Sequence, residues 1–206
     1  RQRQMCIRDR KNTARCIFEY IYFARPDSRI DGMGVYESRV NAGRILAKTH
    51  PVEADLVVGV PESGNPAALG YSMESGIPYG NAFIKNNYVG RTFIKPKQEQ
   101  RESSVKVKLN VLKEEVAGKR VVMIDDSIVR GTTSRRIVNL LRQAGAKEVH
   151  VRISSPAFLH PCYFGTDIPS EDQLVASGRT VDEICKYIEA DSLGYLETDK
   201  LSEMIC

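Results

Sequence analysis

The chain has 206 residues, of which 42% are hydrophobic and 27% charged. This size and composition fit one α/β domain or two small ones, and they exclude a collagen-like or wholly disordered chain. Every apolar stretch is much shorter than the roughly 18 residues that cross a bilayer, so we expect a cytoplasmic protein with no membrane partner.

The net charge of +4 is unevenly distributed along the chain. Residues 1–15 hold six Lys or Arg and one Asp, and residues 85–108 hold seven Lys or Arg and two Glu. The remainder is mildly acidic, and this pattern indicates a small polyanionic substrate rather than nucleic acid. The first residues show no helical or strand period. We therefore expect an unstructured or artefactual tail at 1–11 and one domain at 12–206.

The sequence pattern predicts a helix, a strand and a second helix in the first half of the domain. Apolar residues recur at helical spacing from Val35 to Lys48, and Pro51 follows closely enough to end that helix. Residues 54–60 form an apolar run typical of a strand buried on both faces. A turn at 62–65 then leads into a helix with Pro66 at its first position and Gly76 at its end.

The second half repeats the strand-loop-helix pattern. Residues 84–116 are basic and without a sustained period, as in a lid, a binding loop or a disordered segment. A strand at 121–124, a loop, a helix from Ser134 to Ala144 and a strand at 149–153 follow. Short helices are expected at 171–176 and 181–189. This alternation predicts an α/β fold with a mostly parallel sheet, which binds ligands at the carboxyl ends of its strands.

The segment at 121–134, VVMIDDSIVRGTTS, carries the most chemistry. Four apolar residues place Asp125 and Asp126 at the end of a strand, and a Gly- and hydroxyl-rich turn leads into a helix. Backbone N–H groups at such a helix N-terminus favour a phosphate, and adjacent carboxylates can hold sugar hydroxyls or Mg²⁺. A bare acidic pair is more often a solvent-facing turn, but the complete run favours the ligand site.

This run resembles the phosphoribosyl pyrophosphate signature of the type I phosphoribosyltransferases. Segments 16–28, 59–64, 85–94 and 126–133 further resemble the amidophosphoribosyltransferase family, in the same order along the chain. The resemblance covers residues 12–205 and only the phosphoribosyltransferase half of that family. It implies a type I phosphoribosyltransferase fold with a flexible substrate-covering loop. We expect a piece that lacks the glutaminase domain, is cut short at its C-terminal end, and uses free ammonia.

The resemblance assigns roles to individual residues. Asp125 and Asp126 would engage the ribose hydroxyls and Mg²⁺, Ser63 in the loop with Gly64 would contribute to pyrophosphate and metal binding, and Lys85 and Arg91 would act as catalytic cations beside the leaving pyrophosphate. The 5′-phosphate would be bound by a loop made of Arg130, Gly131, Thr132, Thr133 and Ser134, and Ser127 would also bind the substrate. The alternatives are an ordinary turn at Ser63 and a solvated basic loop at 85–104.

The cysteines suggest a second cofactor. Some members of the family carry a [4Fe-4S] cluster, and Cys16 and Cys162 match two of its four ligand positions. The alternative is that both are free thiols in this chain, since such a cluster usually needs four thiolates. Cys185 has a spacing typical of core packing, and the three histidines show no metal-ligand spacing.

The resemblance implies an enzyme of purine biosynthesis that converts phosphoribosyl pyrophosphate and ammonia, derived from glutamine in the intact enzyme, into 5-phosphoribosylamine. It also implies purine nucleotides as feedback inhibitors and a homo-oligomer, commonly a tetramer. Two alternatives are a phosphoribosyl-pyrophosphate-binding regulator without turnover and a base-specific phosphoribosyltransferase.

Overall fold

The computed structural model describes residues 16–85, 109–162 and 170–205. Its centre is a parallel sheet in the order β3-β6-β7-β8, with strands Leu56–Gly59, Arg120–Asp125, Glu148–Ile153 and Ser192–Tyr195. The strands predicted at 54–60, 121–124 and 149–153 are confirmed with small shifts at their ends. The edge strand β8 was not predicted. The α/β class with a mostly parallel sheet is confirmed.

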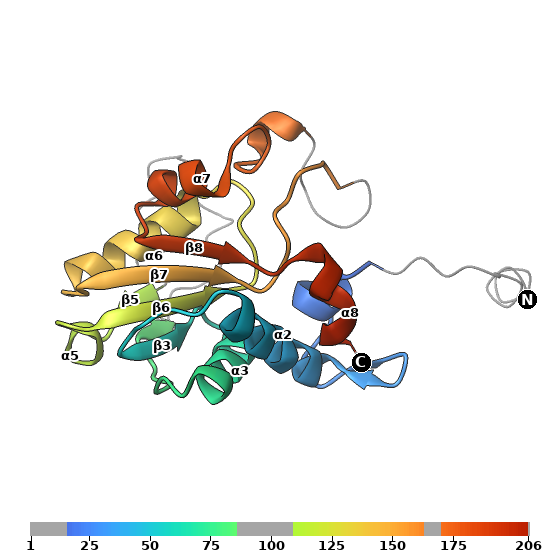
Figure 1. Ribbon diagram of the computed structural model, residues 1–206, viewed down its shortest axis with the longest axis horizontal. Coiled ribbons are helices and arrows are strands. Elements are labelled where there is room, and N and C mark those ends of the chain that lie inside the picture. Colours follow the sequence, from blue (N-terminus) through green and yellow to red (C-terminus); the bar gives the residue numbers. More distant parts are fainter. Residues whose placement is uncertain (1–15, 86–108, 163–169, 206) are drawn as a thin grey trace, which may run out of the picture.

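Four longer helices cover the two faces of this sheet (Figure 1). The helices α2 and α3 lie on one face, and α6 and α7 lie on the other; their bounds are Val35–Thr49, Asn65–Ser75, Thr132–Gln143 and Val181–Ile188. As predicted, α3 ends at Gly76, whose φ of +74° is the left-handed conformation that glycine adopts without strain. Helix α6 begins two residues before the predicted Ser134.

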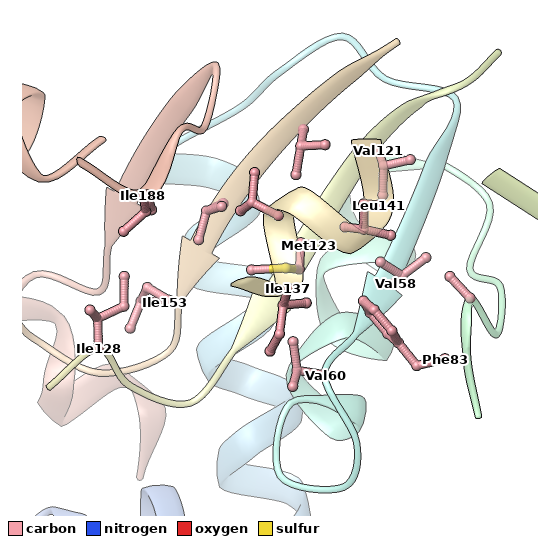
Figure 2. Close-up of a cluster of buried hydrophobic side chains, with 14 of the residues drawn as sticks. Val58, Val60, Phe83, Val121, Met123, Ile128, Ile137, Leu141, Ile153 and Ile188 are labelled. Carbon is pink, nitrogen blue, oxygen red and sulfur yellow. The ribbon is translucent and has the colours of Figure 1, made fainter. Parts of the chain in front are cut away.

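Each face of the sheet has its own core because successive strand residues point to opposite sides. In β6, Val121 and Met123 pack with Ile137 and Leu141 of α6, as Figure 2 shows. Their neighbours Val122 and Ile124 pack instead with residues of α2 and α3. Because β6 is buried on both faces, its sequence is an unbroken apolar run rather than an alternation of apolar and polar residues.

The helices α2 and α3 cross with their backbones in close contact. A Cβ atom placed on Gly43 would lie 1.8 Å from the carbonyl oxygen of Ala67, and one on Gly70 would lie 1.9 Å from that of Val40. No side chain fits in such a space, so glycine at both positions allows the crossing. This crossing fixes α3, and with it the loop that precedes α3, against the rest of the domain.

Shorter elements flank the sheet. A π-helical turn η1 spans Glu19–Phe23, and two antiparallel strand pairs join β1 with β2 and β4 with β5. The remaining bounds are Arg29–Ile30 for β1, Met33–Gly34 for β2, Phe83–Lys85 for β4, Leu109–Val111 for β5, Lys113–Val116 for α5, Thr198–Lys200 for η4 and Leu201–Met204 for α8. The expectation that 84–116 is irregular was thus wrong at both of its ends.

The helix predicted at 171–176 was also wrong. Only a 3₁₀ turn, η3, forms at Glu171–Gln173. Leu174 then adopts an extended backbone and is buried with Val175 and Ala176, so this apolar run docks on the core without a helical period. None of the helices in the described part of the chain is long and apolar enough to cross a membrane.

Candidate functional site

The candidate site lies where β3 and β6 end side by side. The two strands are parallel neighbours, with Gly59 in register with Ile124, so the loops that follow them meet at one edge of the sheet. A cleft of about 600 Å³ opens there. The residues that line it are Phe18, Tyr22, Phe23, Val60, Pro61, Ser63, Asp125, Asp126, Ser127, Val129, Arg130, Gly131, Thr132, Thr133, Ser134, Ile137 and Phe158.

The loop after β3 is pressed against the end of β6. The N–H of Val60 donates to the carbonyl oxygen of Ile124 over 2.8 Å. A Cβ atom on Gly64 would lie 2.4 Å from that same oxygen, so only glycine permits this approach. Gly64 is not among the residues lining the cleft; it supports the loop from behind and thereby sets the position of Ser63.

The two aspartates lie at the end of β6 with different surroundings. Asp125 is the last strand residue, and burial together with the negative charge of Asp126 raises its pKa well above the ordinary value. Asp126 accepts hydrogen bonds from the hydroxyl groups of Ser63, over 2.8 Å, and Ser127, over 2.9 Å. Both aspartates are more than nine-tenths buried as whole residues, yet both line the cleft. Ser63 and Asp126 thus join the two loops through a direct contact.

The loop after the aspartates ends at the N-terminus of α6. Gly131 has a φ of +75°, and a Cβ atom there would lie 2.8 Å from the ring of Tyr187 on α7. The described structure shows no side-chain cap on this helix. First-turn N–H groups have no acceptor within their own helix, so they favour an anion, and the hydroxyls of Thr132, Thr133 and Ser134 lie beside them.

This loop is held from outside by the segment before α7. The N–H of Val175 donates to the carbonyl oxygen of Val129 over 2.8 Å. The guanidinium group of Arg130 donates to the side chain of Gln173. The buried run at 174–176 therefore fixes the outer side of the loop, while the inner side faces the cleft.

A group of aromatic side chains, here called the aromatic wall, lines part of the cleft. It consists of Phe18, Tyr22, Phe23 and Phe158. The ring centroids of Phe18 and Phe158 are 4.6 Å apart, and those of Tyr22 and Phe23 are 5.7 Å apart. The sequence pattern did not predict that these residues belong to the site. Segment 16–28 is rich in aromatic residues, which could have indicated a ligand-facing surface. The pattern of that segment by itself does not indicate what its side chains face.

Of the two predicted catalytic cations, Lys85 alone belongs to the described residues. Lys85 ends β4 and does not line the cleft; its ammonium group forms an exposed ion pair with Glu62, over 3.3 Å, next to Ser63. Arg91 lies outside the described residues, as does most of the loop at 85–104. The other predicted substrate-binding residues, from Ser63 through Ser134, line one cleft, apart from Gly64.

The site offers oxygen ligands. The hydroxyl of Ser63 and the carboxylates of Asp125 and Asp126 suit Mg²⁺, which typically keeps several waters and binds one or two carboxylates together with substrate phosphates. Within the described ranges, no three His, Cys, Asp or Glu residues gather closely enough to hold a metal by themselves. The donor set therefore fits Mg²⁺ that arrives with a phosphorylated substrate.

The two predicted cluster ligands, Cys16 and Cys162, belong to the described residues. Cys16 is exposed and Cys162 half-buried, and the nearby rings of Phe18 and Phe158 bring their segments together. The thiol of Cys185 donates instead to the carbonyl oxygen of Ala190, which follows the C-terminal end of α7. Within the described residues no third potential ligand gathers with Cys16 and Cys162, so a cluster on these two thiols stays a prediction.

Comparison with known proteins agrees with this geometry. Residues 39–154 match the family model described as a phosphoribosyl transferase domain, which is more than half of the chain. The chain belongs to this family. The fold class expected from the resemblance, that of the type I phosphoribosyltransferases, is thereby confirmed.

This phosphoribosyl transferase domain is also similar to individual enzymes. It is 58% identical to the amidophosphoribosyltransferase of Archaeoglobus fulgidus over 92% of this chain and 42% of the relative, and 55% identical to that of Bacillus subtilis over 92% and 40%. The chain thus spans about 40% of the length of these curated relatives. The resemblance to amidophosphoribosyltransferases is confirmed over this shared part.

Two solved structures extend the comparison. One is described as the allosteric regulatory enzyme of purine biosynthesis, with a TM-score of 0.84 and 55% identity over 93% of this chain and 41% of that one. The other is the glutamine phosphoribosylpyrophosphate amidotransferase of B. subtilis complexed with ADP and GMP, with a TM-score of 0.83 and 55% identity over 92% and 42%.

Proposed function

We propose that the cleft binds 5-phosphoribosyl 1-pyrophosphate and that the chain supplies the phosphoribosyltransferase part of an amidophosphoribosyltransferase. The observation that carries this proposal is the shared lining of one cleft by the acidic pair, Asp125 and Asp126, and by the hydroxyl-rich N-terminus of α6. A phosphorylated sugar presents the two matching groups, a dianionic phosphate and vicinal hydroxyls. The similarity to amidophosphoribosyltransferases supports the same substrate.

In this proposal each side of the cleft binds one part of the substrate. The backbone N–H groups and hydroxyls of residues 130–134 bind the 5′-phosphate, helped by the positive end of the α6 dipole. Asp125 and Asp126 accept hydrogen bonds from the ribose hydroxyls. The loop with Ser63 lies on the other side of Asp126 and borders the pyrophosphate.

The reaction replaces an oxygen by a nitrogen at C1 of the ribose. The C1–O bond to pyrophosphate breaks with its electron pair staying on the leaving group, and ammonia forms the new C1–N bond. The extra proton on nitrogen passes to solvent, which leaves 5-phosphoribosylamine. Ammonia is itself a nucleophile, so positioning and electrostatic stabilisation supply most of the rate and no general base is needed.

Mg²⁺ held by Ser63, Asp125 and Asp126 would supply charge neutralisation at the leaving pyrophosphate. Lys85 and Arg91 are proposed to add positive charge on the same side. The ion pair of Lys85 with Glu62 supports this placement, because it brings the ammonium group to the loop that carries Ser63. The aromatic wall limits the access of water to C1.

Further proposals concern the whole protein. Ammonia would come from glutamine, which the name of the B. subtilis relative includes, and a separate glutaminase part would release it. Purine nucleotides are proposed as feedback inhibitors, since that relative was solved with ADP and GMP. We also propose that residues 12–206 form one domain and that the protein is a homo-oligomer.

The test is release of pyrophosphate from phosphoribosyl pyrophosphate with Mg²⁺ and ammonium chloride. We expect ammonia-dependent release that Asp126→Asn reduces at least tenfold, while Asp199→Asn, at an acidic residue of η4 that does not line the cleft, leaves it unchanged. Binding without release would favour a regulator. Turnover that requires orotate or a purine base would favour a base-specific enzyme. Either result contradicts the proposal.

A further inference from the structure

A second, smaller cavity lies on the outer side of the proposed phosphate loop at 130–134. Its volume is about 260 Å³, and we call it the outer pocket. Tyr187 in its wall packs against Gly131 of the phosphate loop. Of the residues that line each cavity, Arg130 alone belongs to both the outer pocket and the cleft. The residues of the outer pocket that matter here are Arg130, Asp172, Gln173, Val175, Arg179 and Tyr187.

Two arginines bring positive charge to the outer pocket without a bound counter-ion. The guanidinium group of Arg130 donates to the side-chain oxygen of Gln173, and that of Arg179 donates to the carbonyl oxygen of Val175 over 3.3 Å. Both acceptors are uncharged, so they orient the guanidinium groups without neutralising them. Within the described ranges of the chain, neither arginine forms an ion pair with a carboxylate. Each guanidinium group keeps further N–H donors for a ligand.

The ring of Tyr187 helps to hold one of these charges at the pocket wall. The guanidinium carbon of Arg179 lies 5.7 Å from the ring centroid, and that of Arg135 lies 5.8 Å from it. Arg135 is neutralised by an ion pair with Glu189, whereas Arg179 is not. A cation near an aromatic face is attracted by the ring. Arg179 is therefore placed by an aromatic ring and a backbone carbonyl, and its charge stays available.

This arrangement suits a small, doubly charged anion. Planar guanidinium groups bind phosphate through paired N–H donors, and in a cavity of this size one phosphate can contact donors from both arginines. Asp172 lines the same pocket and adds one negative charge against two positive ones. The balance stays positive, while the carboxylate repels an anion and lowers its affinity. The sign of each charge can thus be tested separately.

We propose that the outer pocket binds inorganic phosphate between Arg130 and Arg179, and that this binding weakens binding of the 5′-phosphate in the cleft. Arg130 links the two sites because it lines both cavities and has a single guanidinium group. A phosphate in the outer pocket keeps that group beside Gln173 and away from the cleft. The link between the sites rests on the proposed function, whereas phosphate binding in the outer pocket does not.

The first experiment titrates inorganic phosphate into the chain after the cleft is filled with phosphoribosyl pyrophosphate and Mg²⁺, without ammonia. We expect one calorimetric binding event with a dissociation constant of about 1 mM. Arg179→Met should weaken it about fivefold and Arg179→Lys less than about threefold, whereas Asp172→Asn should strengthen it about threefold. Arg44→Met is the matched control, because Arg44 is an exposed arginine of α2 that lines neither cavity.

The second experiment measures the affinity for phosphoribosyl pyrophosphate with and without phosphate at about ten times its dissociation constant. Phosphate also competes directly at the 5′-phosphate position, but this competition is common to the parent and Arg179→Met. We therefore expect phosphate to weaken substrate binding about threefold more in the parent than in Arg179→Met. Thermal unfolding of every variant separates these effects from a loss of structure, which cannot produce opposite changes in affinity.

Three results would overturn the inference. The chain with a filled cleft may bind no phosphate at all, or it binds phosphate with an affinity that Arg179→Met and Asp172→Asn leave unchanged. In the third, phosphate weakens substrate binding equally in the parent and Arg179→Met, which removes the link through Arg130. All three leave the proposed function intact. If the folded chain binds no phosphoribosyl pyrophosphate, the proposed function and the link fail, and phosphate titration of the unliganded chain and its variants still decides the outer site.

Discussion

The hydroxyl group of Ser63 donates to Oδ1 of Asp126 over 2.8 Å and joins two loops that are 63 residues apart in the sequence. One loop follows β3 and the other follows β6, which are parallel neighbours. The contact allows the proposed pyrophosphate side and ribose side of the cleft to be positioned together. The contact gives Ser63 a partner outside the turn that it forms.

Ser63→Ala should therefore weaken binding of phosphoribosyl pyrophosphate with Mg²⁺ by about tenfold, because one hydrogen bond to a charged group is lost. Titration calorimetry measures the affinity. Ser202→Ala, in helix α8, serves as a control with an exposed serine that does not line the cleft. Equal affinity for Ser63→Ala and the parent would show that the contact does not contribute to the site.

Gly131→Ala should lower the free energy of unfolding by about 1–2 kcal/mol. The new Cβ atom would be strained by the φ of +75° and would lie 2.8 Å from the ring of Tyr187. Urea denaturation measures the loss. The double variant Gly131→Ala with Tyr187→Leu should recover only the part due to the ring contact, whereas full recovery would mean that the backbone conformation costs nothing.

Gly70→Ala should destabilise the domain by about 2 kcal/mol or more, in spite of the higher helix propensity of alanine. The added methyl group would lie 1.9 Å from the carbonyl oxygen of Val40, so α2 and α3 must separate. Thermal and urea unfolding report the change. Gly34→Ala is the control because its Cβ atom would lie no closer than 3.7 Å to its neighbours. A stable Gly70→Ala would disprove the close crossing.

Asp55 provides a prediction about acid stability. Hydrogen bonds from the Arg120 side chain and from its backbone N–H lower the pKa of this carboxyl to about 2. The pKa of this carboxyl is near 4 in the unfolded chain, so the lower folded-state pKa stabilises the fold at pH values above about 4. This contribution to stability is lost as the pH falls from about 4 to 2. The stability difference between the parent and Asp55→Asn should be constant from pH 5 to 7 and shrink below pH 4. A difference independent of pH would contradict the assignment.

The sequence predicted those parts of the fold in which local pattern and burial agree. The apolar run at 121–124 became β6, and Gly76 ends α3 because its left-handed backbone suits glycine. The acidic pair and the hydroxyl-rich turn were found for the same reason, since strand, loop and helix start are contiguous there. Nine predicted binding residues share one cleft: Ser63, Asp125, Asp126, Ser127, Arg130, Gly131, Thr132, Thr133 and Ser134.

The features that depend on distant contacts were not predictable in this way. β8 is four residues long and includes Gly194, so it is recognised only by its pairing with β7. The aromatic wall combines η1 with Phe158, which is more than 130 residues away in the chain. Arg39 lies on the helix predicted between Val35 and Lys48, but its side chain donates to the carbonyl oxygens of Tyr20 and Ala24, which belong to another segment.

The most direct test of the central claim is titration calorimetry of the folded chain with phosphoribosyl pyrophosphate, with and without Mg²⁺, beside Thr133→Val in the proposed phosphate loop. We predict saturable binding of one ligand per chain that requires Mg²⁺ for full affinity and weakens about tenfold in Thr133→Val. Absence of binding by the folded parent chain at saturating Mg²⁺ would contradict the assignment of the cleft.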